Sequence, residues 1–236
     1  MIKDLYKNTM RYKILILPIF YLSYINGYDL SEYEAKYKFN SSEISVTGIR
    51  EFKKNEDGYE IRFNASNLLA SLFFSSKFSI DNGEVNSKKY DVKIRPKFLK
   101  KDQSIVFNKK QSFIESNGHT SWKFEFDNSS LLLDPLNVQI MIRILIKAGL
   151  DNFELDIIDM EKGGSKTYSY AVQKDETCIV NNTEYNCIIL KRYRENNQRV
   201  VKYYLAKELD YMFVKIIDTS PDKVNTLELK EVLSFG

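Results

Sequence analysis

The sequence predicts a mainly β fold, either a large curved antiparallel sheet or an incomplete barrel, with one long helix packed on its apolar face. Short runs of alternating apolar and polar residues recur along most of the 236-residue chain, and a period of two is typical of half-buried strands. Clusters of Gly, Asn and Asp separate these runs. A single apolar segment, between residues 134 and 149, has helical rather than alternating periodicity.

The first run, Tyr33–Phe39, shows the alternation most clearly. Its four apolar side chains alternate with three charged ones. Because successive side chains of a strand point to opposite faces, we expect one face of this strand in the core and the other in water. The same period of two recurs in Tyr59-Ile61-Phe63, Tyr90-Val92-Ile94, Trp122-Phe124-Phe126, Phe153-Leu155-Ile157, Tyr168-Tyr170-Val172, Val201-Tyr203-Leu205 and Leu227-Leu229.

Short turns are predicted between these runs. They are Glu56-Asp57-Gly58, Asp81-Asn82-Gly83, Ser116-Asn117-Gly118, Gly163-Gly164-Ser165, Asn181-Asn182 and Asn196-Asn197. Strands joined by turns this short pair as antiparallel neighbours. About ten or more strands of this kind leave unpaired edges unless the sheet curls, closes or stacks on itself, so the sheet is expected to be strongly curved.

The exception to the alternation is the predicted helix. Asp134-Pro135 supplies an N-cap and a first-turn proline, the run 136–148 is mostly apolar, and Gly149 suits the C-terminal end. The polar residues Gln139, Arg143 and Lys147 are four apart and therefore form a narrow stripe. We expect this stripe to face water and the other faces of the helix to be covered by the apolar face of the sheet.

The first 27 residues have the pattern of an export signal. Residues 1–13 carry four basic side chains and one acid, and residues 14–25 are uncharged and largely apolar. Twelve helical residues span about 18 Å, which is less than the ~30 Å of hydrocarbon in a bilayer. We therefore predict a signal peptide at residues 1–27, with an uncleaved membrane anchor as the alternative. Residues 28–236 are then expected to form a single β-rich domain that is not integral to the membrane.

Removing this segment also changes the charge balance. The chain has 35 Lys and Arg and 32 Asp and Glu; without the four basic residues and one acid of the signal, 31 of each remain and the net charge is zero. A nucleic-acid-binding surface needs an excess of basic side chains to displace counterions from phosphates. Nucleic acid is therefore not an expected partner.

Cys178 and Cys187 are the two cysteines of the chain, and they flank a predicted hairpin turn at Asn181–Glu184. A four-residue loop places them directly opposite each other, whereas a two-residue loop leaves them diagonal on one face. Either arrangement allows a disulfide in an oxidising compartment. We predict that disulfide for the exported protein; two buried thiols are the alternative.

Catalytic and metal-binding residues are scarce. The single histidine, His119, follows a predicted turn, and although Ser121 and Asp127 are near it in sequence, no nucleophile elbow is present. One histidine and two cysteines do not make a usual zinc site, and the acids between residues 151 and 161 lack calcium-loop spacing. We predict no catalytic residue, metal site or cofactor, and we interpret His119 as an exposed turn residue.

The chain resembles an uncharacterised exported bacterial family, domain of unknown function 3108. The resemblance is carried by Tyr33–Tyr37, Phe78–Gly83, Asp134–Leu136 and, above all, Tyr203–Lys215. In that family the last stretch usually contains Trp-Leu-Ala, then Leu-Asp-Tyr and Pro-Val, and here Tyr204 and Phe213 replace the Trp and the Pro. The resemblance implies an all-β domain and export to the periplasm of a Gram-negative cell. It supplies no catalytic residues.

Three functions remain open at this stage. The first is a binding or carrier protein of the cell envelope, in which the sheet and the helix enclose a lipid, an acyl chain or a hydrophobic segment of a partner. The second is a structural or adaptor protein that docks another envelope protein. The third, a hydrolase, would depend on His119 or on a distant pair of acids. Sequence patterns alone do not identify the ligand-binding residues.

Overall fold

The computed structural model describes residues 29–68, 70–96, 101–127, 130–194 and 198–236, so the predicted signal peptide lies outside the described residues. The first eight strands are β1 (Tyr33–Asn40), β2 (Ser45–Asn55), β3 (Gly58–Ser66), β4 (Ala70–Asp81), β5 (Glu84–Pro96), β6 (Lys101–Asn108), β7 (Phe113–Gly118) and β8 (Trp122–Glu125). The other strands are β9 (Leu132–Leu133), β10 (Asn152–Ile158), β11 (Ser165–Val180), β12 (Thr183–Tyr193), β13 (Val200–Ala206), β14 (Met212–Thr219) and β15 (Val224–Phe235). Helix α1 (Val138–Lys147) lies between β9 and β10, and two short 3-10 helices are η1 (Lys109–Gln111) and η2 (Lys207–Leu209).

All fifteen strands belong to one sheet, in the order β8-β7-β6-β5-β4-β3-β2-β1-β15-β14-β13-β12-β11-β10-β9. Strands that follow one another in the chain are therefore neighbours in the sheet, except β8 and β9, and the pairing of β1 with β15 joins the two halves. The pairings are antiparallel except for that of β9 with β10, which is parallel. The mainly β, antiparallel prediction is confirmed.

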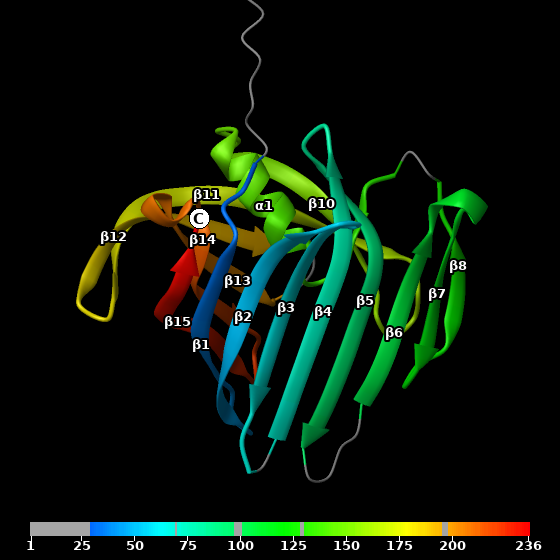
Figure 1. The fold of residues 1–236 in the computed structure, drawn as a ribbon, viewed down its shortest axis with the longest axis horizontal. Coiled ribbons are helices and arrows are strands. Elements are labelled where there is room, and N and C mark those ends of the chain that lie inside the picture. The colour runs from blue at the N-terminus through cyan, green and yellow to red at the C-terminus, as the bar shows by residue number, and fades with distance from the viewer. Residues whose placement is uncertain (1–28, 69, 97–100, 128–129, 195–197) are drawn as a thin grey trace, which may run out of the picture.

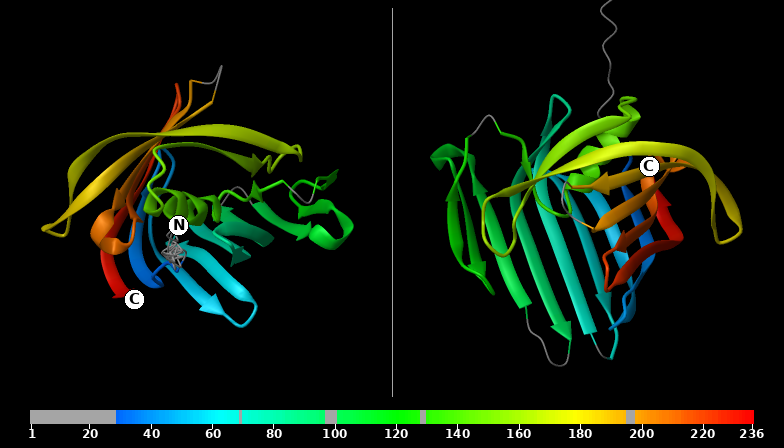
Figure 2. Two further views of the ribbon diagram at one scale, coloured as in Figure 1. Left: turned by 90° about the horizontal axis from the view of Figure 1, so that it is seen from above. Right: turned by 180° about the vertical axis from the view of Figure 1, so that it is seen from behind.

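The sheet is strongly curved and α1 lies on its concave side, as Figures 1 and 2 show. β8 and β9 are its two edges, and among the described residues no backbone pairing joins them. The fold is thus a large open sheet rather than a closed barrel, in agreement with the prediction.

Side chains from β6, β8 and the loop before β8 contact the β10–β11 turn on the opposite side of the opening. The carbonyl oxygen of Met160, just after β10, accepts hydrogen bonds from Gln103 Nε2 (2.6 Å), Thr120 Oγ1 (3.0 Å) and Trp122 Nε1 (3.1 Å). The indole ring of Trp122 also packs closely on Gly163, where an added Cβ would lie 3.1 Å from the ring. We call this group of contacts the seam.

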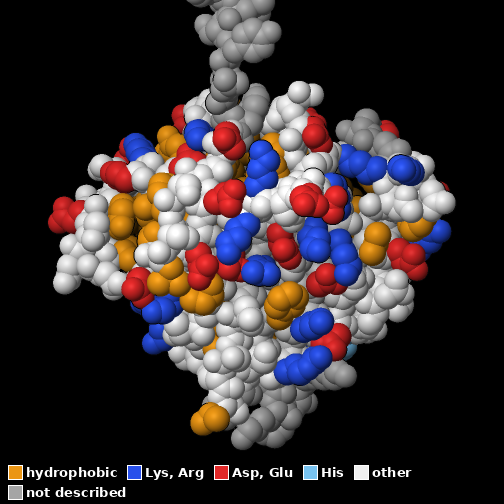
Figure 3. Space-filling model, in the orientation of Figure 1, with side chains coloured by type: hydrophobic (Ala, Val, Ile, Leu, Met, Phe, Trp, Pro, Cys, Tyr) orange, Lys and Arg blue, Asp and Glu red, His pale blue; other side chains and the backbone are white. Residues whose placement is uncertain are grey.

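The predicted strands lie where the alternation placed them. In β1, Tyr33, Ala35 and Tyr37 are buried, and the charged residues between them are partly exposed. Inside the curve, the rings of Phe52, Tyr59 and Phe78 stack on one another, with centroid separations of 5.6 to 6.4 Å. The outer face carries charged pairs instead, such as Lys36 with Glu231 and Lys53 with Glu51. Figure 3 shows acidic and basic side chains intermingled across this face.

One of the predicted turns is wrong. Ser116-Asn117-Gly118 forms the last part of β7, where Ser116 is almost fully buried and pairs with Ile105 and Trp122. The chain turns after Gly118, because β6 extends far enough to pair with all three residues, whereas β8 reaches only Ser116. Asn196-Asn197 lies outside the described residues.

The helix starts later than predicted. Its N-cap is Asn137, which makes no side-chain capping bond. Asp134 instead stabilises the turn that precedes the helix, because its carboxylate accepts hydrogen bonds from the backbone N–H groups of Leu136 and Asn137, both at 2.8 Å. The same carboxylate accepts a bond from Ser76 on β4 (2.6 Å), which ties this turn to the inside of the sheet.

The expectation that the stripe of α1 faces water is also wrong at its centre. Arg143 is only 1% exposed. Its Nε and Nη2 atoms donate hydrogen bonds to the carbonyl oxygen of Asp210 (3.2 and 3.0 Å), and its guanidinium lies over the rings of Tyr33 and Phe52. Arg143 faces the turn after η2 rather than solvent, because the helix lies inside the curve, as predicted, and polar groups of that turn are within its reach. Lys147, at the end of the stripe, is exposed as expected.

Candidate ligand-binding cavity

A cavity of about 560 Å³ lies between the first part of α1 and the concave side of the sheet. Its lining comes from β1 to β5, β14 and β15, from the turn before α1 and from two loops. The lining residues are Phe39, Ser41, Ser42, Glu43, Ile44, Arg50, Phe63, Leu72, Phe74, Tyr90, Ile94, Pro135, Leu136, Gln139, Ile216, Asp218, Lys223, Asn225, Thr226 and Leu227. We refer to this space as the cavity.

Most of the cavity wall is apolar. Inward positions of β3 and β4 supply Phe63, Leu72 and Phe74, and those of β14 and β15 supply Ile216 and Leu227 on the other side. Each of these residues belongs to an alternating strand, so the period that builds the core also directs these side chains to the cavity. Strands far apart in the sequence meet here because β1 pairs with β15.

Two loops form the polar rim of the cavity. Glu43 of the β1–β2 loop and Lys223 of the β14–β15 loop make an ion pair at 2.9 Å. The hydrogen bond from Lys223 lowers the pKa of Glu43, and both side chains are more than half exposed. Asp218, near the end of β14, forms a second ion pair with Arg199. The acids of the lining are therefore each paired with a basic side chain.

Arg50 is the buried polar residue of the lining. β2 directs Val46, Gly48, Arg50 and Phe52 to the concave side, and Arg50 is 1% exposed. Its Nη2 atom donates a hydrogen bond to Gln139 Oε1 of α1 at 2.7 Å. Its guanidinium carbon lies 5.7 Å from the ring centre of Tyr37, which is within cation–π range. The Nε atom has no hydrogen-bond partner.

Asp134 is a second buried ionisable group, adjacent to the lining residue Pro135. Burial raises the pKa of its carboxyl group to about 7, although the hydrogen bonds from Ser76 and from the backbone of Asn137 and Leu136 act in the opposite direction. Its hydrogen-bond partners are the backbone of the turn before α1 and Ser76 of β4, so these bonds fix the turn to the sheet. We therefore assign Asp134 a structural role.

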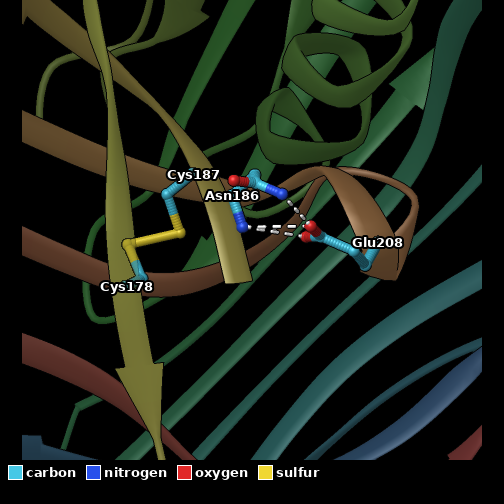
Figure 4. Close-up of a disulfide and its surroundings, with 4 residues drawn as sticks. All are labelled: Cys178, Asn186, Cys187 and Glu208. Carbon is cyan, nitrogen blue, oxygen red and sulfur yellow. Dashed lines mark hydrogen bonds between the residues drawn. A yellow bond between two sulfur atoms is a disulfide. The ribbon is translucent and has the colours of Figure 1, made fainter. Parts of the chain in front are cut away.

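The predicted disulfide between Cys178 and Cys187 is present, with 5.9 Å between the Cα atoms (Figure 4). The turn contains two residues, Asn181 and Asn182, both with positive φ. Cys178 consequently lies opposite Tyr185 rather than opposite Cys187, and the bridge is diagonal. This settles the choice between the two loop lengths that the sequence left open.

The disulfide lies away from the cavity, on a hairpin of β11 and β12 that extends beyond the neighbouring strands (Figure 1). Beside Cys187, the carboxylate of Glu208 accepts hydrogen bonds from the backbone N–H of Asn186 (3.0 and 3.1 Å) and from its side-chain amide (2.6 Å). Figure 4 shows these contacts between the hairpin and the η2 segment. The disulfide thus links the two strands of the hairpin, and Glu208 links the hairpin to η2.

His119 is exposed, as predicted, and does not line the cavity. Its backbone N–H donates to the carbonyl oxygen of Asp102 at 2.6 Å. Of the acids between residues 151 and 161, Glu154 accepts a hydrogen bond from Ser169 and Asp156 accepts one from Thr167, both across the β10–β11 pair. In the described parts of the chain, no three His, Cys, Asp or Glu side chains gather as metal ligands.

Sequence reasoning identified none of the cavity residues as a site. Arg50 carried a usable signal, because it alternates with Val46, Gly48 and Phe52 and therefore occupies an inward position of its strand. A charged residue at such a position is rare unless it has a partner or a function. Gln139 carried no comparable signal, since its position on the helix surface is equally typical of a solvent-exposed residue.

Comparisons with known proteins agree with the fold. A family model described as "Protein of unknown function (DUF3108)" matches residues 28–230, which confirms the resemblance drawn from the sequence. A beta-barrel-like protein of domain of unknown function DUF1849 from Brucella abortus has a similar structure, with a TM-score of 0.56 and 10% sequence identity. The match covers 87% of this chain and 99% of that chain. No curated protein matches the sequence.

The one α-helix in the described ranges is α1, with ten residues. Among these residues, no helix has the length and apolar character needed to cross a membrane.

Proposed function

We propose that this chain, which belongs to the DUF3108 family of proteins of unknown function, binds a hydrophobic ligand in the cavity. The observation that carries the proposal is the apolar lining of the cavity, which has a volume of about 560 Å³ and lies between α1 and the concave side of the sheet. Cavities for small ligands have volumes of roughly 300–1,000 Å³ and are mostly apolar with a few polar groups that orient the ligand. Both features are present here.

The cavity is a local feature of an otherwise well-packed interior. Ile105, Ile114, Leu133 and Ile140 are among many core side chains with no exposed surface. Protein interiors normally leave few voids larger than a water molecule. A space of this size beside such a core therefore supports a binding role rather than inefficient packing.

The proposed setting is the periplasm of a Gram-negative cell. Two features support it: the N-terminal pattern of a basic region followed by an apolar one, and the disulfide between Cys178 and Cys187. Disulfides persist mainly in oxidising compartments. Cleavage of residues 1–27 would release a carrier that exchanges its ligand with other components of the envelope.

Native mass spectrometry of protein purified without detergent tests the binding role. We expect a co-purifying apolar ligand, or uptake of an added long-chain lipid at one molecule per chain. Replacing Ile216, which lines the cavity, by Trp should lower this uptake at least about tenfold, because the larger ring occupies the binding space.

The matched control is Ile217→Trp on the same strand. Ile217 points to the other face of β14 and does not line the cavity. This variant should bind as the original chain does. Equal uptake by both variants, or no uptake by the original chain, would contradict the proposal; the adaptor alternative would then be examined by crosslinking in cells.

A further inference from the structure

Arg50 is a buried cation whose charge is not balanced by any described acid. It is 1% exposed, and its recorded contacts are the hydrogen bond to the neutral side chain of Gln139 and the ring of Tyr37. Among the described residues no carboxylate forms an ion pair with it. Its Nε–H group is also without an acceptor.

This arrangement is energetically unfavourable on its own. A guanidinium group keeps its proton under all ordinary conditions, so it cannot escape the cost of burial by becoming neutral. Buried charges in proteins are normally paired, and buried N–H donors normally have acceptors. Arg50 thus lacks two things that a single anionic group would supply: negative charge and an acceptor for Nε.

Arg143 provides an internal comparison. It is equally buried and also lies over aromatic rings. However, Asp210 supplies it with a carbonyl acceptor at 3.0 Å and with a carboxylate oxygen at 3.7 Å. The chain therefore balances the charge of Arg143 from its own residues, although Nη1 of Arg143, like Nε of Arg50, has no hydrogen-bond partner. Arg143 does not line the cavity, whereas Arg50 does.

The acids of the cavity lining form ion pairs with other basic residues and not with Arg50. Glu43 is paired with Lys223, and Asp218 is paired with Arg199. Both acids belong to the rim side of the cavity, near the β1–β2 and β14–β15 loops, whereas Arg50 contacts α1. The cavity consequently has an apolar wall, a rim of paired charges and an unpaired cation at the helix.

We infer that the ligand is an anionic amphiphile whose acid headgroup binds the guanidinium of Arg50 and whose apolar tail lies along Phe63, Leu72 and Phe74. The inference rests on the proposed function and names its ligand class. A carboxylate or a phosphate monoester suits this position, since both accept paired hydrogen bonds from a guanidinium group. The headgroup would lie inside the protein, near α1.

Binding of matched ligands to the purified, delipidated chain tests the inference. Palmitate, hexadecyl phosphate and hexadecanol share one tail and differ in the headgroup. We expect at least one of the two acids to bind roughly 10- to 100-fold more tightly than the neutral alcohol, the difference expected for hydrogen bonds to a charged group. The tighter of the two acids identifies the headgroup.

Arg50→Gln should remove this preference, lowering the affinity for the acid by roughly 10- to 100-fold while leaving that for hexadecanol unchanged or higher. The matched control is Arg62→Gln, which removes a cation from an exposed position paired with Glu51 on the outer face. That variant should retain the preference. If acids and alcohol bind equally and Arg50→Gln changes nothing, the headgroup inference is overturned and the cavity proposal stands. If none of the three ligands binds, both fail.

A measurement on the unmodified chain covers the case in which Arg50→Gln does not fold. Palmitate labelled with 13C at the carboxyl carbon reports its own ionisation by NMR. A neighbouring guanidinium should lower the pKa of the bound acid below its value in water, whereas an apolar cavity without a cation would raise it. A raised pKa would overturn the inference.

Discussion

Asp134 is a buried side chain that connects the turn before the helix to the sheet and also makes the stability of the fold depend on pH. Its carboxyl group is fully buried and accepts hydrogen bonds from Ser76 and from the turn before α1. Burial raises its pKa from 3.8 to about 7 in the folded chain. The folded state therefore favours the protonated form more strongly than the unfolded state does.

The stabilising contribution of this group is fully present below about pH 4 and is lost as the pH rises to about 7, where the buried carboxyl ionises. A difference of about three pKa units corresponds to a contribution on the order of 4 kcal/mol. We expect Asp134→Asn to remove this part of the pH dependence while keeping acceptors for the turn.

Denaturant unfolding at pH 4 and at pH 7.5 measures the effect. The relevant quantity is the difference between the original chain and Asp134→Asn, because other acids titrate in the opposite sense. Glu51, for example, has its pKa lowered to about 2, chiefly by its hydrogen bond with Arg62. Relative to the Asn variant, the original chain should lose stability on going to pH 7.5; parallel curves would show that Asp134 does not titrate in this range.

At the scale of elements, the distal part of the β11–β12 hairpin, between Thr177 and Asn186, has no strand pairing other than its own among the described residues. Its tip carries the exposed side chain of Ile179 and the diagonal disulfide between Cys178 and Cys187. Glu208 supplies the neighbouring contact from η2. We therefore expect the disulfide to control local opening of this hairpin more than global unfolding.

Replacing both cysteines by Ala tests this expectation. The chain-entropy model gives a stabilisation of about 2–3 kcal/mol for a loop this short. Backbone amides between Thr177 and Asn186 should exchange with deuterium faster in the variant, while those of β3 and β4 should be unchanged. Exchange that is identical throughout the two proteins would rule out a stabilising role for the bridge.

At the scale of the whole molecule, we expect the seam to help the curved sheet keep its shape. The edges β8 and β9 are not paired with each other, and the contacts between Trp122, Gln103, Met160 and Gly163 connect the two sides. An open sheet of this length exposes polar backbone groups at both ends. Side-chain contacts across the seam limit that exposure.

Trp122→Ala should weaken the seam. We expect a loss of about 2–3 kcal/mol in unfolding free energy, less than for a fully buried Trp because this one is partly exposed. Faster hydrogen exchange in β8 and in the β10–β11 turn should accompany it, with β2 unaffected. The control is Val106→Ala on β6, two strands from β8, where the side chain is 42% exposed. Equal stability of the two variants would exclude the seam as a structural tie.

Much of the fold could be predicted from local patterns. The alternation in Tyr33–Phe39 predicts an inward and an outward face without knowledge of any partner strand, because side-chain direction depends on the backbone of the strand itself. The turn at Asn181-Asn182 is local in the same sense, as Asn tolerates positive φ. Ser116-Asn117-Gly118 failed as a turn because all three residues pair with β6, a partner from another part of the chain, and this pairing outweighed the local preference.

The sequence by itself determined the mainly β architecture, the helix and the hairpin that brings Cys178 and Cys187 together, since each depends on residues close to one another in the chain. The burial of Arg143, the role of Asp134 and the position of Arg50 in the cavity were decided only by the tertiary structure. Each of these depends on groups far away in the sequence, namely Asp210, Ser76 and Gln139, and no local pattern specifies which segments meet.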